Sequence, residues 1–449
     1  MPSASLHPDW QARPYWWDEL PLAPAQGELP SRTDVAIVGS GYTALSAARI
    51  LARHGLSVTV LDARDPGFGA STRNHGMVGG GLKLPAELDR TLGTERADRI
   101  RKNARDSFVE FKQIIADEAL EVDYCDSGRL TAAHTPGAYQ RQVRRGEELA
   151  RNFGYHTRML PRDEQHAEIG SDFYYGALLV AESGGLQPAK LHRAFWRLAE
   201  HAGARIVGNA AVHAIEGRHG AFTVRTAKGD LRADKVFVAT NAYTGAISPR
   251  FHPYVRRRVV PVTAYMATTE ELPADVAHAI LPTNRMCGDT KRSLFAFRLS
   301  PDRRRVIFAG RARWRDIGER AATPILHRFM SEVWPVLKTY RVTHCWKGLV
   351  CFTFDRLPHM GEVDGLYYAA GCQGSGVVMM SYLGRQVAHK IIGGNAVQCG
   401  FDGLPFPGRP GYGGRPWFLP AVGGYYKTRD AIERRLAARS AGQANRAGA

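Results

Sequence analysis

Several features that would place this chain in a specialised class of proteins are missing from its sequence. No apolar run approaches the roughly 18 residues that a membrane-spanning helix needs. The opening segment MPSASLHPDW contains no apolar stretch of the kind found in secretory signals. The sequence also shows no internal repeat and no long low-complexity tract. We therefore expect a globular protein without a membrane span, working in the cytoplasm.

Cysteine is scarce, and its spacing excludes the usual cysteine-based sites. The six cysteines form no C-x-x-C pair, and none stands at a metal-ligand spacing from a histidine. In a chain of 449 residues, isolated cysteines of this kind are typical of free thiols. We therefore expect no disulfide bond and no metal site.

Acidic side chains are outnumbered by basic ones. The chain has 60 Lys and Arg residues against 43 Asp and Glu residues, which gives a formal net charge of +17. Such a surplus occurs in proteins that bind nucleic acids or anionic membranes. Here the arginines are spread along the chain, and no basic stripe is interleaved with aromatic residues. We therefore attribute the surplus to composition and expect no nucleic-acid partner.

Residues 33–63, TDVAIVGSGYTALSAARILARHGLSVTVLDA, carry the strongest pattern in the sequence. A short β-rich apolar run leads directly into Gly39-x-Gly41-x-x-Ala44. Apolar residues then recur at helical spacing, and a second apolar run ends at Asp62. Strand, glycine turn, helix, strand and acidic residue in this order are typical of a dinucleotide-binding unit.

Each position in this unit has a physical role. Gly39 permits the tight turn out of the strand, Gly41 lets the backbone approach a pyrophosphate, and Ala44 is small enough for the helix to pack on the sheet. The helix N-terminus offers free N–H groups to the phosphates. The carboxylate of Asp62 can accept hydrogen bonds from both ribose hydroxyls, and it disfavours a 2′-phosphate. The sequence therefore predicts a site for FAD or NAD rather than NADP.

The rest of the chain alternates between two patterns. Helix–strand patterns of the dinucleotide type return after residue 185 and again after residue 341, where Gly371-x-x-Gly374-x-Gly376 opens a helix. Strand-rich segments separate them, which predicts an α/β fold with a discontinuous cofactor domain and an α+β substrate domain built on a large antiparallel sheet. We expect the Arg/Ala-rich end of the chain to be frayed. The expected parts are an N-terminal arm (1–32), the cofactor domain (33–96, 185–254 and 341–398), the substrate domain (97–184 and 255–340) and a C-terminal tail (399–449).

Four segments taken together resemble one enzyme family. They are GSGYTA at residues 39–44, GFGASTRNHG at 67–76, ATNAY at 239–243 and the C-terminal run from WKG to GCQGSGV. Their combination resembles the D-amino-acid-oxidase-like FAD-dependent oxidoreductases, and most of all the γ-glutamylputrescine oxidase-type members. The resemblance covers nearly the whole chain. It implies a Rossmann-like FAD-binding domain of the glutathione-reductase type and an enzyme that oxidises an amine or amino acid.

The resemblance also implies which residues bind FAD. By this resemblance the first glycine turn holds the pyrophosphate, the second glycine-rich stretch wraps the flavin edge, and the C-terminal glycines bring a helix N-terminus to the flavin pyrimidine. A helix dipole at that place stabilises the anionic N1–O2 edge of reduced flavin. The residues implied are Gly39, Gly41, Tyr42, Thr43, Asp62, Ala63, Gly69, Ala70, Ser71, Arg73, Asn74, Gly76, Met77, Val212, Ala239, Thr240, Gly348, Gly371, Gln373, Gly374, Gly376 and Val377.

Two departures from the family pattern shape the prediction. Sarcosine-oxidase-like relatives attach FAD through a cysteine, and the corresponding position here is Gly348, so we expect FAD to be bound non-covalently. The basic residues that clamp a substrate carboxylate in those relatives correspond to Gly76, Gly79 and Val378. An unpaired buried carboxylate is costly, so we expect an amine whose reacting carbon carries none, such as a polyamine, an acylated polyamine or an ω-amino acid.

Flavin amine oxidation needs few acid–base groups, because the neutral amine passes its α-hydrogen to flavin N5 and water hydrolyses the imine. We expect O2 or another acceptor to reoxidise the flavin. The candidate residues on the substrate side are His75 in the flavin-edge segment, Arg298 as a carboxylate ligand and Trp346 as a pocket wall. Their structural alternatives are a histidine bonded to loop backbone, a solvated arginine and a core tryptophan. Two other functions stay open: an FAD-containing RNA-modification factor and a quinone-linked dehydrogenase on an anionic membrane surface.

Overall fold

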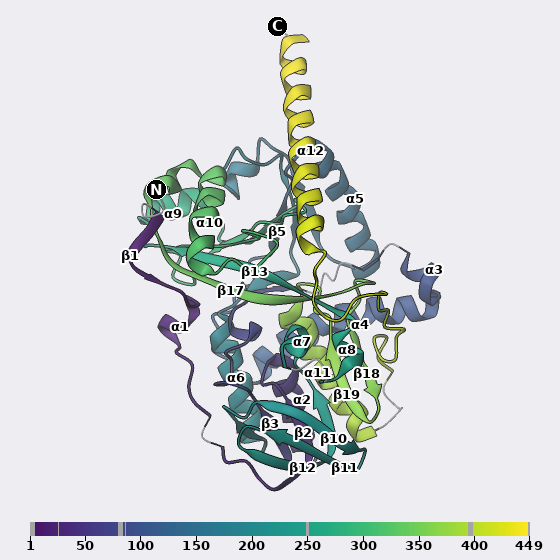
Figure 1. Cartoon of the computed structure of the whole chain (residues 1–449). Helices are drawn as coiled ribbons and strands as arrows, with labels where there is room; N and C mark the ends of the chain where they lie inside the picture. The colour runs from purple at the N-terminus through teal and green to yellow at the C-terminus, as the bar shows by residue number, and fades with distance from the viewer. Residues whose placement is uncertain are drawn as a thin grey trace.

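Two β-sheets, each with its own hydrophobic core, organise the molecule (Figure 1). The computed structural model describes residues 5–25, 27–79, 84–85, 87–247, 251–393 and 398–447, with side chains as far as residue 437. In Figure 1 the smaller sheet lies at the bottom and the larger sheet lies above it. The predicted α/β fold with a Rossmann-like part and a part built on a large sheet is confirmed.

The smaller, eight-stranded sheet is built around the dinucleotide-type unit. Its order is β10-β11-β12-β2-β3-β9, and β19, which pairs with β18, also joins β12. β12 is parallel to β2 and to β19, a pairing that requires long crossover connections. The strands are β2 (Arg32–Val38), β3 (Val58–Leu61), β9 (Arg205–Val207), β10 (Val212–Arg218), β11 (Ala221–Thr226), β12 (Gly229–Val238), β18 (His359–Val363) and β19 (Leu366–Ala370).

The larger, nine-stranded sheet has the order β1-β17-β13-β16-β15-β14-β5-β7-β6. It is largely antiparallel, with parallel pairing between β1 and β17 and between β14 and β5. A separate two-stranded sheet joins β4 to β8. The strands are β1 (Leu6–Gln11), β4 (Met77–Gly79), β5 (Arg129–Ala132), β6 (Thr157–Leu160), β7 (Ala177–Val180), β8 (Ser183–Gly185), β13 (Val259–Thr269), β14 (Met286–Asp289), β15 (Ala296–Leu299), β16 (Val306–Gly310) and β17 (Val342–Thr353).

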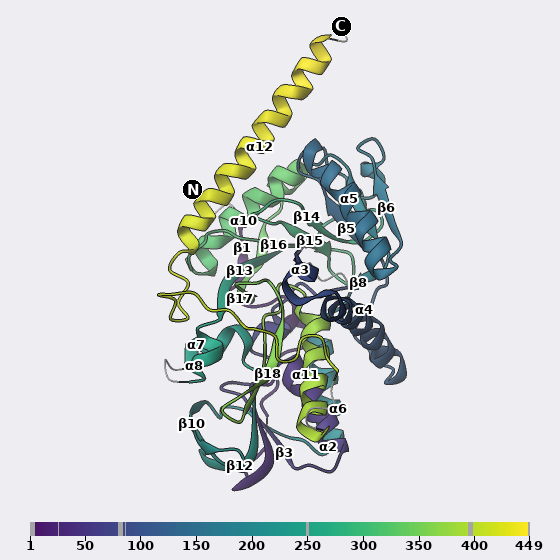
Figure 2. The same ribbon diagram turned by 90° about the vertical axis from the view of Figure 1, so that its right-hand side faces the viewer.

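Helices cover both sheets (Figure 2). α2 packs against α6 and α11 beside the smaller sheet, and α10 packs on β13, β16 and β17 of the larger one. Gly384 of α11 lies so close to α2 that a Cβ there would stand 2.1 Å from the Thr43 carbonyl oxygen. The helices are α1 (Trp16–Glu19), α2 (Tyr42–Arg53), α3 (Leu88–Leu92), α4 (Thr94–Asp117), α5 (Pro136–Phe153), α6 (Pro188–His201), α7 (Thr244–Ile247), α8 (Pro253–Arg256), α9 (Ala274–Ile280), α10 (Glu319–Val333), α11 (Gly376–Gly393) and α12 (Leu419–Ala447).

The sheets divide the chain differently from the sequence-based boundaries at two places, the first being β1 of the predicted N-terminal arm, which pairs with β17 at the edge of the large sheet. We grouped residues 341–398 with the cofactor domain, yet β17 lies in the large sheet, paired along its length with β13. The chain therefore passes from the large sheet to the smaller one after Thr353 rather than near residue 341. The alternating pattern of β17 does not reveal which sheet the strand joins. The domain boundaries as a whole stay a prediction.

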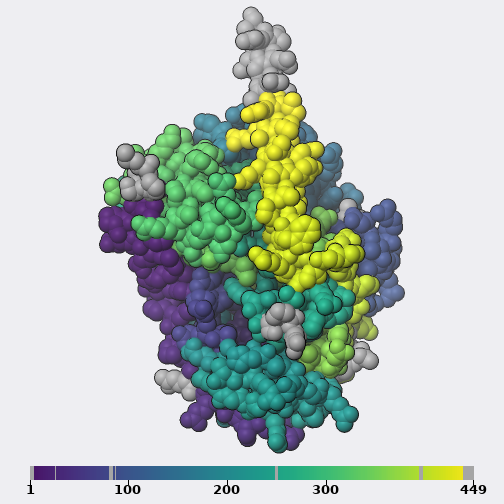
Figure 3. Space-filling view, in the orientation of Figure 1, coloured from purple at the N-terminus to yellow at the C-terminus, as the bar shows by residue number. Residues whose placement is uncertain are grey.

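The N-terminal arm and the first part of the C-terminal helix are both attached to the body, whereas the rest of that helix projects away from it (Figures 1 and 2). In the N-terminal arm, Trp16 Nε1 donates a hydrogen bond to the Asn74 carbonyl at 2.9 Å, and Trp17 Nε1 donates to Thr72 Oγ1 at 3.0 Å. The C-terminal segment forms the long helix α12, so the expectation of a frayed end is wrong. Asp430 anchors this helix through an ion pair of 3.1 Å with Arg292. Figure 3 shows α12 in yellow beside the green surface around α10.

Candidate active site

A single continuous cavity of about 1300 Å³ runs between the two sheets. One end, which we call the cofactor end, is lined by the β2–α2 turn, the end of β3 and the start of β10. The other end, which we call the chamber, lies under β5, β7 and β15 and reaches α5. The implied FAD residues that line the cavity are Gly39, Gly41, Tyr42, Thr43, Asp62, Ala63, Gly69, Ala70, Ser71, Asn74, Met77, Val212, Ala239, Thr240, Gly374, Gly376 and Val377.

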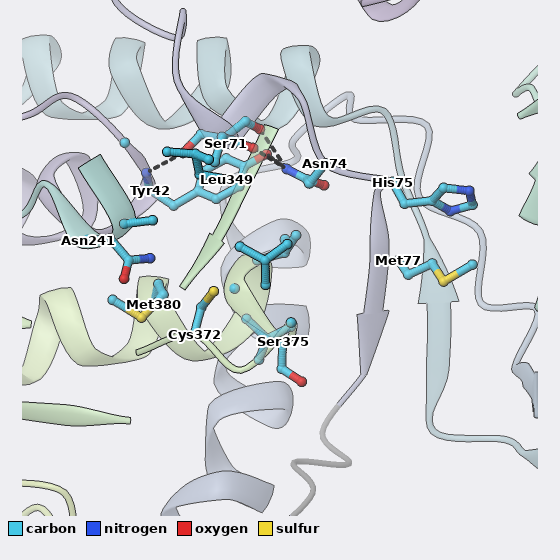
Figure 4. Close-up of a pocket in the computed structure, with 18 of the residues that line it drawn as sticks. Tyr42, Ser71, Asn74, His75, Met77, Asn241, Leu349, Cys372, Ser375 and Met380 are labelled. Atoms are coloured by element: carbon cyan, nitrogen blue, oxygen red, sulfur yellow. Dashed lines mark hydrogen bonds between the residues drawn. The ribbon is translucent and has the colours of Figure 1, made fainter. Parts of the chain in front are cut away.

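The turn between β2 and α2 is held in shape by close backbone contacts. Gly39 has a φ of +97°, and a Cβ there would lie 3.3 Å from the Ala239 carbonyl oxygen. A Cβ on Gly41 would meet Ser71 Oγ at 3.0 Å. That hydroxyl accepts a hydrogen bond from the Tyr42 amide at 3.1 Å (Figure 4). The glycines therefore let three distant segments meet at the start of α2, where the helix dipole favours an anion.

Asp62 is oriented toward the cavity by backbone and hydroxyl donors. The amide and the hydroxyl of Ser40 donate to one carboxylate oxygen at 3.0 and 2.5 Å, and the Arg64 amide donates to the other at 3.0 Å. Burial raises the pKa of Asp62, although these donors oppose the shift. The carboxylate is thus fixed at the end of β3, where it can still accept hydrogen bonds from ribose hydroxyls. The sequence motif did not reveal the contribution of Ser40.

The glycine-rich loop before α11 has an inner and an outer side. Gly374 and Gly376 line the cavity, and α11 begins at Gly376. Gly371 and Gln373 lie behind the loop: a Cβ on Gly371 would meet Thr353 Cγ2 at 2.6 Å, and the Gln373 amide donates to Thr353 Oγ1 at 2.7 Å. These two residues were implied to contact FAD, but they shape the loop and lie outside the cavity lining.

Asn241, which the sequence analysis did not single out, connects this loop to the smaller sheet. Its φ is +44°, and its side-chain oxygen accepts a hydrogen bond from the Gly371 amide at 3.0 Å. It lines the cavity beside Ala239 and Thr240 (Figure 4). The asparagine in ATNAY was the available signal, because asparagine tolerates a left-handed backbone.

The second glycine-rich stretch also separates supporting residues from lining residues. Asn74 lines the cavity and ties its own loop, donating to the Ser71 carbonyl at 2.8 Å and accepting from the Gly76 amide at 2.8 Å. Arg73 lies outside the lining and donates to the Phe68 carbonyl at 2.7 Å. A Cβ on Gly76 would stand 2.1 Å from the Leu186 carbonyl oxygen, so a side chain there cannot extend into the cavity. Gly348 faces Arg73 and likewise lies outside the lining.

Of the three substrate-side candidates, only His75 lines the cavity. Its Nε2 is 3.2 Å from the Ile307 carbonyl oxygen, and because a carbonyl only accepts, Nε2 carries the proton. Nδ1 is buried and has no hydrogen-bond partner among the described residues. Burial, together with the nearby Arg298 cation, lowers the pKa of His75 to about 3. The imidazole is therefore neutral and leaves one acceptor nitrogen unused.

Arg298 and Trp346 occupy structural positions instead. The buried guanidinium of Arg298 donates to the carbonyls of Leu186 at 2.8 Å and Leu299 at 3.0 Å, and burial lowers its pKa to about 10. Trp346 is fully buried, and its Nε1 donates to the Arg73 carbonyl at 3.0 Å. Arg298 and Trp346 both attach the loop at residues 67–76 to the large sheet. The predictions that Arg298 is a carboxylate ligand and Trp346 a pocket wall therefore find no support in the cavity lining.

The sequence analysis missed Arg129, which lines the chamber. Leu130 and Ala132 of the same strand pack into the core under α10, so Arg129 and Thr131 point to the opposite face of β5. The pattern R-L-T-A alone suggests a strand with a solvated polar face. That face becomes the interior of a cavity only when the large sheet closes over the smaller one, which local sequence does not show.

Comparison with known proteins assigns the family. The family model described as FAD dependent oxidoreductase (DAO) matches residues 34–390. The chain belongs to this family. It is 32% identical over 411 residues to gamma-glutamylputrescine oxidoreductase of Escherichia coli, covering 89% of this chain and 93% of that protein. It is 30% identical over 407 residues to a probable oxidoreductase OrdL of Rhizobium meliloti, covering 88% and 92%.

Solved structures of other flavoenzyme-type oxidoreductases share the fold. Glycine oxidase from Geobacillus kaustophilus matches with a TM-score of 0.68 at 19% identity, over 80% of this chain and 94% of that chain. L-proline dehydrogenase from P. horikoshii matches with a TM-score of 0.65 at 20% identity, over 81% and 94%. The predicted family and the enzyme class are thereby confirmed, and the protein is an FAD-dependent oxidoreductase. The glycine cradle, the oriented Asp62 and the two helix N-termini in the cavity fit an elongated dinucleotide of this kind.

No helix within the described ranges is long and apolar enough to cross a membrane. Within the same ranges, no group of three or more His, Cys, Asp or Glu side chains is arranged to hold a metal ion. The cysteines at residues 125, 287, 345, 351, 372 and 399 are free thiols.

Proposed function

We propose that this enzyme oxidises the carbon–nitrogen bond of a small-molecule amine to an imine, with FAD held non-covalently and reoxidised by O2 or another acceptor. The observation that supports this most is the continuous cavity, which leads from a dinucleotide cradle to a chamber under the large sheet. The identity of 32% to a gamma-glutamylputrescine oxidoreductase points to an amine rather than an alcohol as the substrate. The free thiols agree with a cytoplasmic location.

The chain itself has to orient the amine, exclude water and favour the neutral amine. When bound, FAD accepts a hydride at N5. Leu178, Val180 and Ala296 give the chamber apolar walls, which disfavour a charged ammonium group. The unused Nδ1 of His75 accepts a hydrogen bond from the amine N–H, which keeps the nitrogen lone pair free and orients the neighbouring C–H bond. Water that enters after oxidation hydrolyses the imine.

The surroundings of the cysteines nearest the proposed flavin-binding segments support non-covalent binding. Cys351 lies on β17, fully buried, and burial raises the pKa of its thiol. Cys372 lines the cavity, but its Sγ donates to the Cys351 carbonyl at 3.5 Å and thus points toward β17. Acid precipitation of the protein should therefore release all flavin into the supernatant. A yellow, flavin-labelled polypeptide after denaturation would contradict the proposal.

The residues at the positions where relatives carry a carboxylate clamp support a substrate that has no carboxylate on its reacting carbon. Val378 lines the cavity and offers no charge. Gly79 also lines it, whereas Gly76 is turned toward Leu186 and carries no information about the substrate. Of the three positions, only Val378 and Gly79 therefore bear on the choice of substrate.

One experiment tests the function directly. The purified holoenzyme is mixed under anaerobic conditions with putrescine, N-acylated putrescines, ω-amino acids, sarcosine, glycine and D-amino acids, and flavin absorbance is followed. We expect bleaching by amines of the first three kinds, and recovery of the oxidised spectrum when air or a quinone is admitted. Bleaching only by glycine, sarcosine or D-amino acids would overturn the substrate assignment. No bleaching by any amine would overturn the function.

A further inference from the structure

The part of the chamber wall that the large sheet forms contains a buried cation, Arg129, which no described residue pairs with. No hydrogen bond or ion pair among the described residues involves the side chain of Arg129, and its Nε is buried without an acceptor. Burial lowers the pKa of this guanidinium, although an arginine remains charged at neutral pH. A desolvated, unpaired cation is costly to maintain. A ligand anion would remove that cost.

Several other charged side chains around the chamber have partners, and Arg144 of α5, which also lines the cavity, is exposed to solvent. Glu182 is 2.6 Å from His156, and Glu148 is 3.3 Å from Arg145. On the same face of the sheet, Arg298 is bonded to backbone carbonyls. Arg129 differs from Arg298 in that it lines the cavity and makes none of these contacts. It is therefore the cation of this wall that is available to a ligand.

The guanidinium of Arg129 lies over the neighbouring strand on the cavity side. A Cβ placed on Gly288 of β14 would stand 3.2 Å from Arg129 Nη2. Gly288 pairs with Thr131 on one side and with Ala296 on the other, and both of those residues line the cavity. The missing side chain at Gly288 thus leaves the space that the guanidinium occupies. Thr131, two residues along β5 from Arg129 and on the same face, also lines the cavity and offers a hydroxyl donor.

The strand order sets how far this cation lies from the flavin-edge loop. His75 rests on Ile307 of β16, and β16, β15, β14 and β5 are successive neighbours in the sheet. Three strand spacings of about 4.8 Å place the backbone of β5 about 14 Å from that of β16. The two side chains lie closer together than these backbones, because the Arg129 cation is among the causes that lower the pKa of His75. An anion at Arg129 and an amine at His75 can therefore belong to one substrate with several atoms between them.

We infer that Arg129, assisted by Thr131, binds a carboxylate at the far end of the substrate, so that the enzyme selects long amines with a remote carboxylate. The inference rests on the proposed function, because it takes the amine end of the substrate to lie beside His75. It assigns to Arg129 the role that the sequence analysis gave to Arg298. It also explains why the chamber contains a cation although neither Val378 nor Gly79 supplies a basic side chain: the carboxylate lies at the far end of the substrate and not on the reacting carbon.

A matched pair of substrates tests this role. N-succinylputrescine and N-butyrylputrescine have acyl chains of the same length, one ending in a carboxylate and the other in a methyl group. We expect wild-type kcat/KM to be at least tenfold higher for the succinyl compound. Arg129→Met should lower that value by about 100-fold, mainly through KM, because a charge-assisted hydrogen-bonded pair is lost. For the butyryl compound it should change kcat/KM by no more than about threefold.

Two further variants separate this role from general charge effects. Arg129→Lys keeps the charge but loses the bidentate geometry, so it should retain part of the preference for the succinyl compound. Arg144→Met removes an exposed arginine of α5 that lines the same cavity, and it should leave the preference unchanged. Equal losses on both substrates in Arg129→Met, or a loss of the preference in Arg144→Met, would overturn the inference.

A binding measurement distinguishes failure of the inference from failure of the proposed function. Glutarate is titrated into the holoenzyme by calorimetry, which needs no turnover. We expect wild type to bind it and Arg129→Met to bind it at least tenfold more weakly. If no amine is oxidised but this difference is seen, the anion site stands and the proposed function is wrong. If glutarate binds equally to both proteins, the anion site is wrong, whatever amines are oxidised.

Discussion

The two ends of the cavity differ in whether backbone or side chains give them their shape. At the cofactor end the shape comes from backbone: Gly39, Gly371 and Gly374 have positive φ, and helix N-termini face the cavity. In the chamber the shape comes from alternate side chains of a sheet, among them Arg129 and Leu178. A backbone-built site needs glycine at fixed spacings, whereas a side-chain-built site accepts almost any residue. The first kind of site is conspicuous in the sequence and the second is not.

The largest expected effect tests the backbone-built end. Gly384 of α11 lies against α2, with space for no Cβ beside the Thr43 carbonyl. Gly384→Val forces the two helices apart, and we expect a loss of more than about 4 kcal/mol in the free energy of unfolding, or no folded protein. Yield and thermal unfolding measure this.

A control for this prediction lies on the same helix. Gly393, at the end of α11, has nothing within 4 Å of a built Cβ, and its φ is not positive. Gly393→Ala should leave stability unchanged or raise it by up to about 1 kcal/mol through helix propensity. If Gly384→Val folded as well as Gly393→Ala, close helix contact would not determine the geometry of the cofactor end.

The cofactor end could be predicted from the sequence because each feature that shapes it leaves a pattern in a short stretch of sequence. The spacing Gly39-x-Gly41 with Asp62 at the end of the next strand fixes both a turn and an acid. Sequence reasoning did not foresee the surroundings of Arg298, because a strand arginine gives no sign of whether cavity, solvent or backbone carbonyls surround it. It also failed for Gly76, where an apparent loss of a basic group is a packing requirement of Leu186. Such positions depend on contacts between segments far apart in the chain.

The second prediction contrasts the two buried arginines. Arg298 supports the loop at residues 75–76 and the carbonyls of Leu186 and Leu299, so Arg298→Met should lower the free energy of unfolding by about 3 kcal/mol. Arg129 has no such partners, and Arg129→Met should be neutral or stabilising by up to about 1 kcal/mol in the absence of ligand. Urea unfolding of both variants measures the difference. Equal destabilisation would mean that Arg129 has a structural role like that of Arg298.

The third prediction concerns the acid of the cofactor end. Asp62 accepts hydrogen bonds from Ser40 and Arg64 and faces the cavity, so Asp62→Ala removes a ribose partner and loosens the turn. We expect FAD affinity of the apoprotein to weaken by about 1–3 kcal/mol. Asp62→Asn keeps one acceptor oxygen and should lose less. Unchanged affinity in Asp62→Ala would mean that the dinucleotide lies elsewhere in the cavity.

The smallest expected effect concerns His75, which lies where the two ends of the cavity meet and donates a hydrogen bond to the Ile307 carbonyl. The pKa of His75 in the folded protein is about 3, below the ordinary value of 6.5, because the ring is buried near Arg298. As the pH falls below 6.5, His75 is protonated in the unfolded chain but stays neutral in the folded protein, so the free energy of unfolding decreases. Between pH 7 and pH 5.5 this one group lowers the free energy of unfolding by about 1 kcal/mol.

Substitution of this histidine isolates its share of the pH dependence. His75→Gln can still donate to the Ile307 carbonyl but cannot titrate, so its stability should fall by about 1 kcal/mol less than that of wild type over the same interval. Urea unfolding at pH 7 and pH 5.5 gives both slopes, and the difference between them cancels the contribution of every other group. Parallel slopes would show that His75 is protonated in the folded state. A protonated ring could not accept the hydrogen bond of an amine at Nδ1, so that result would also remove His75 from the proposed reaction.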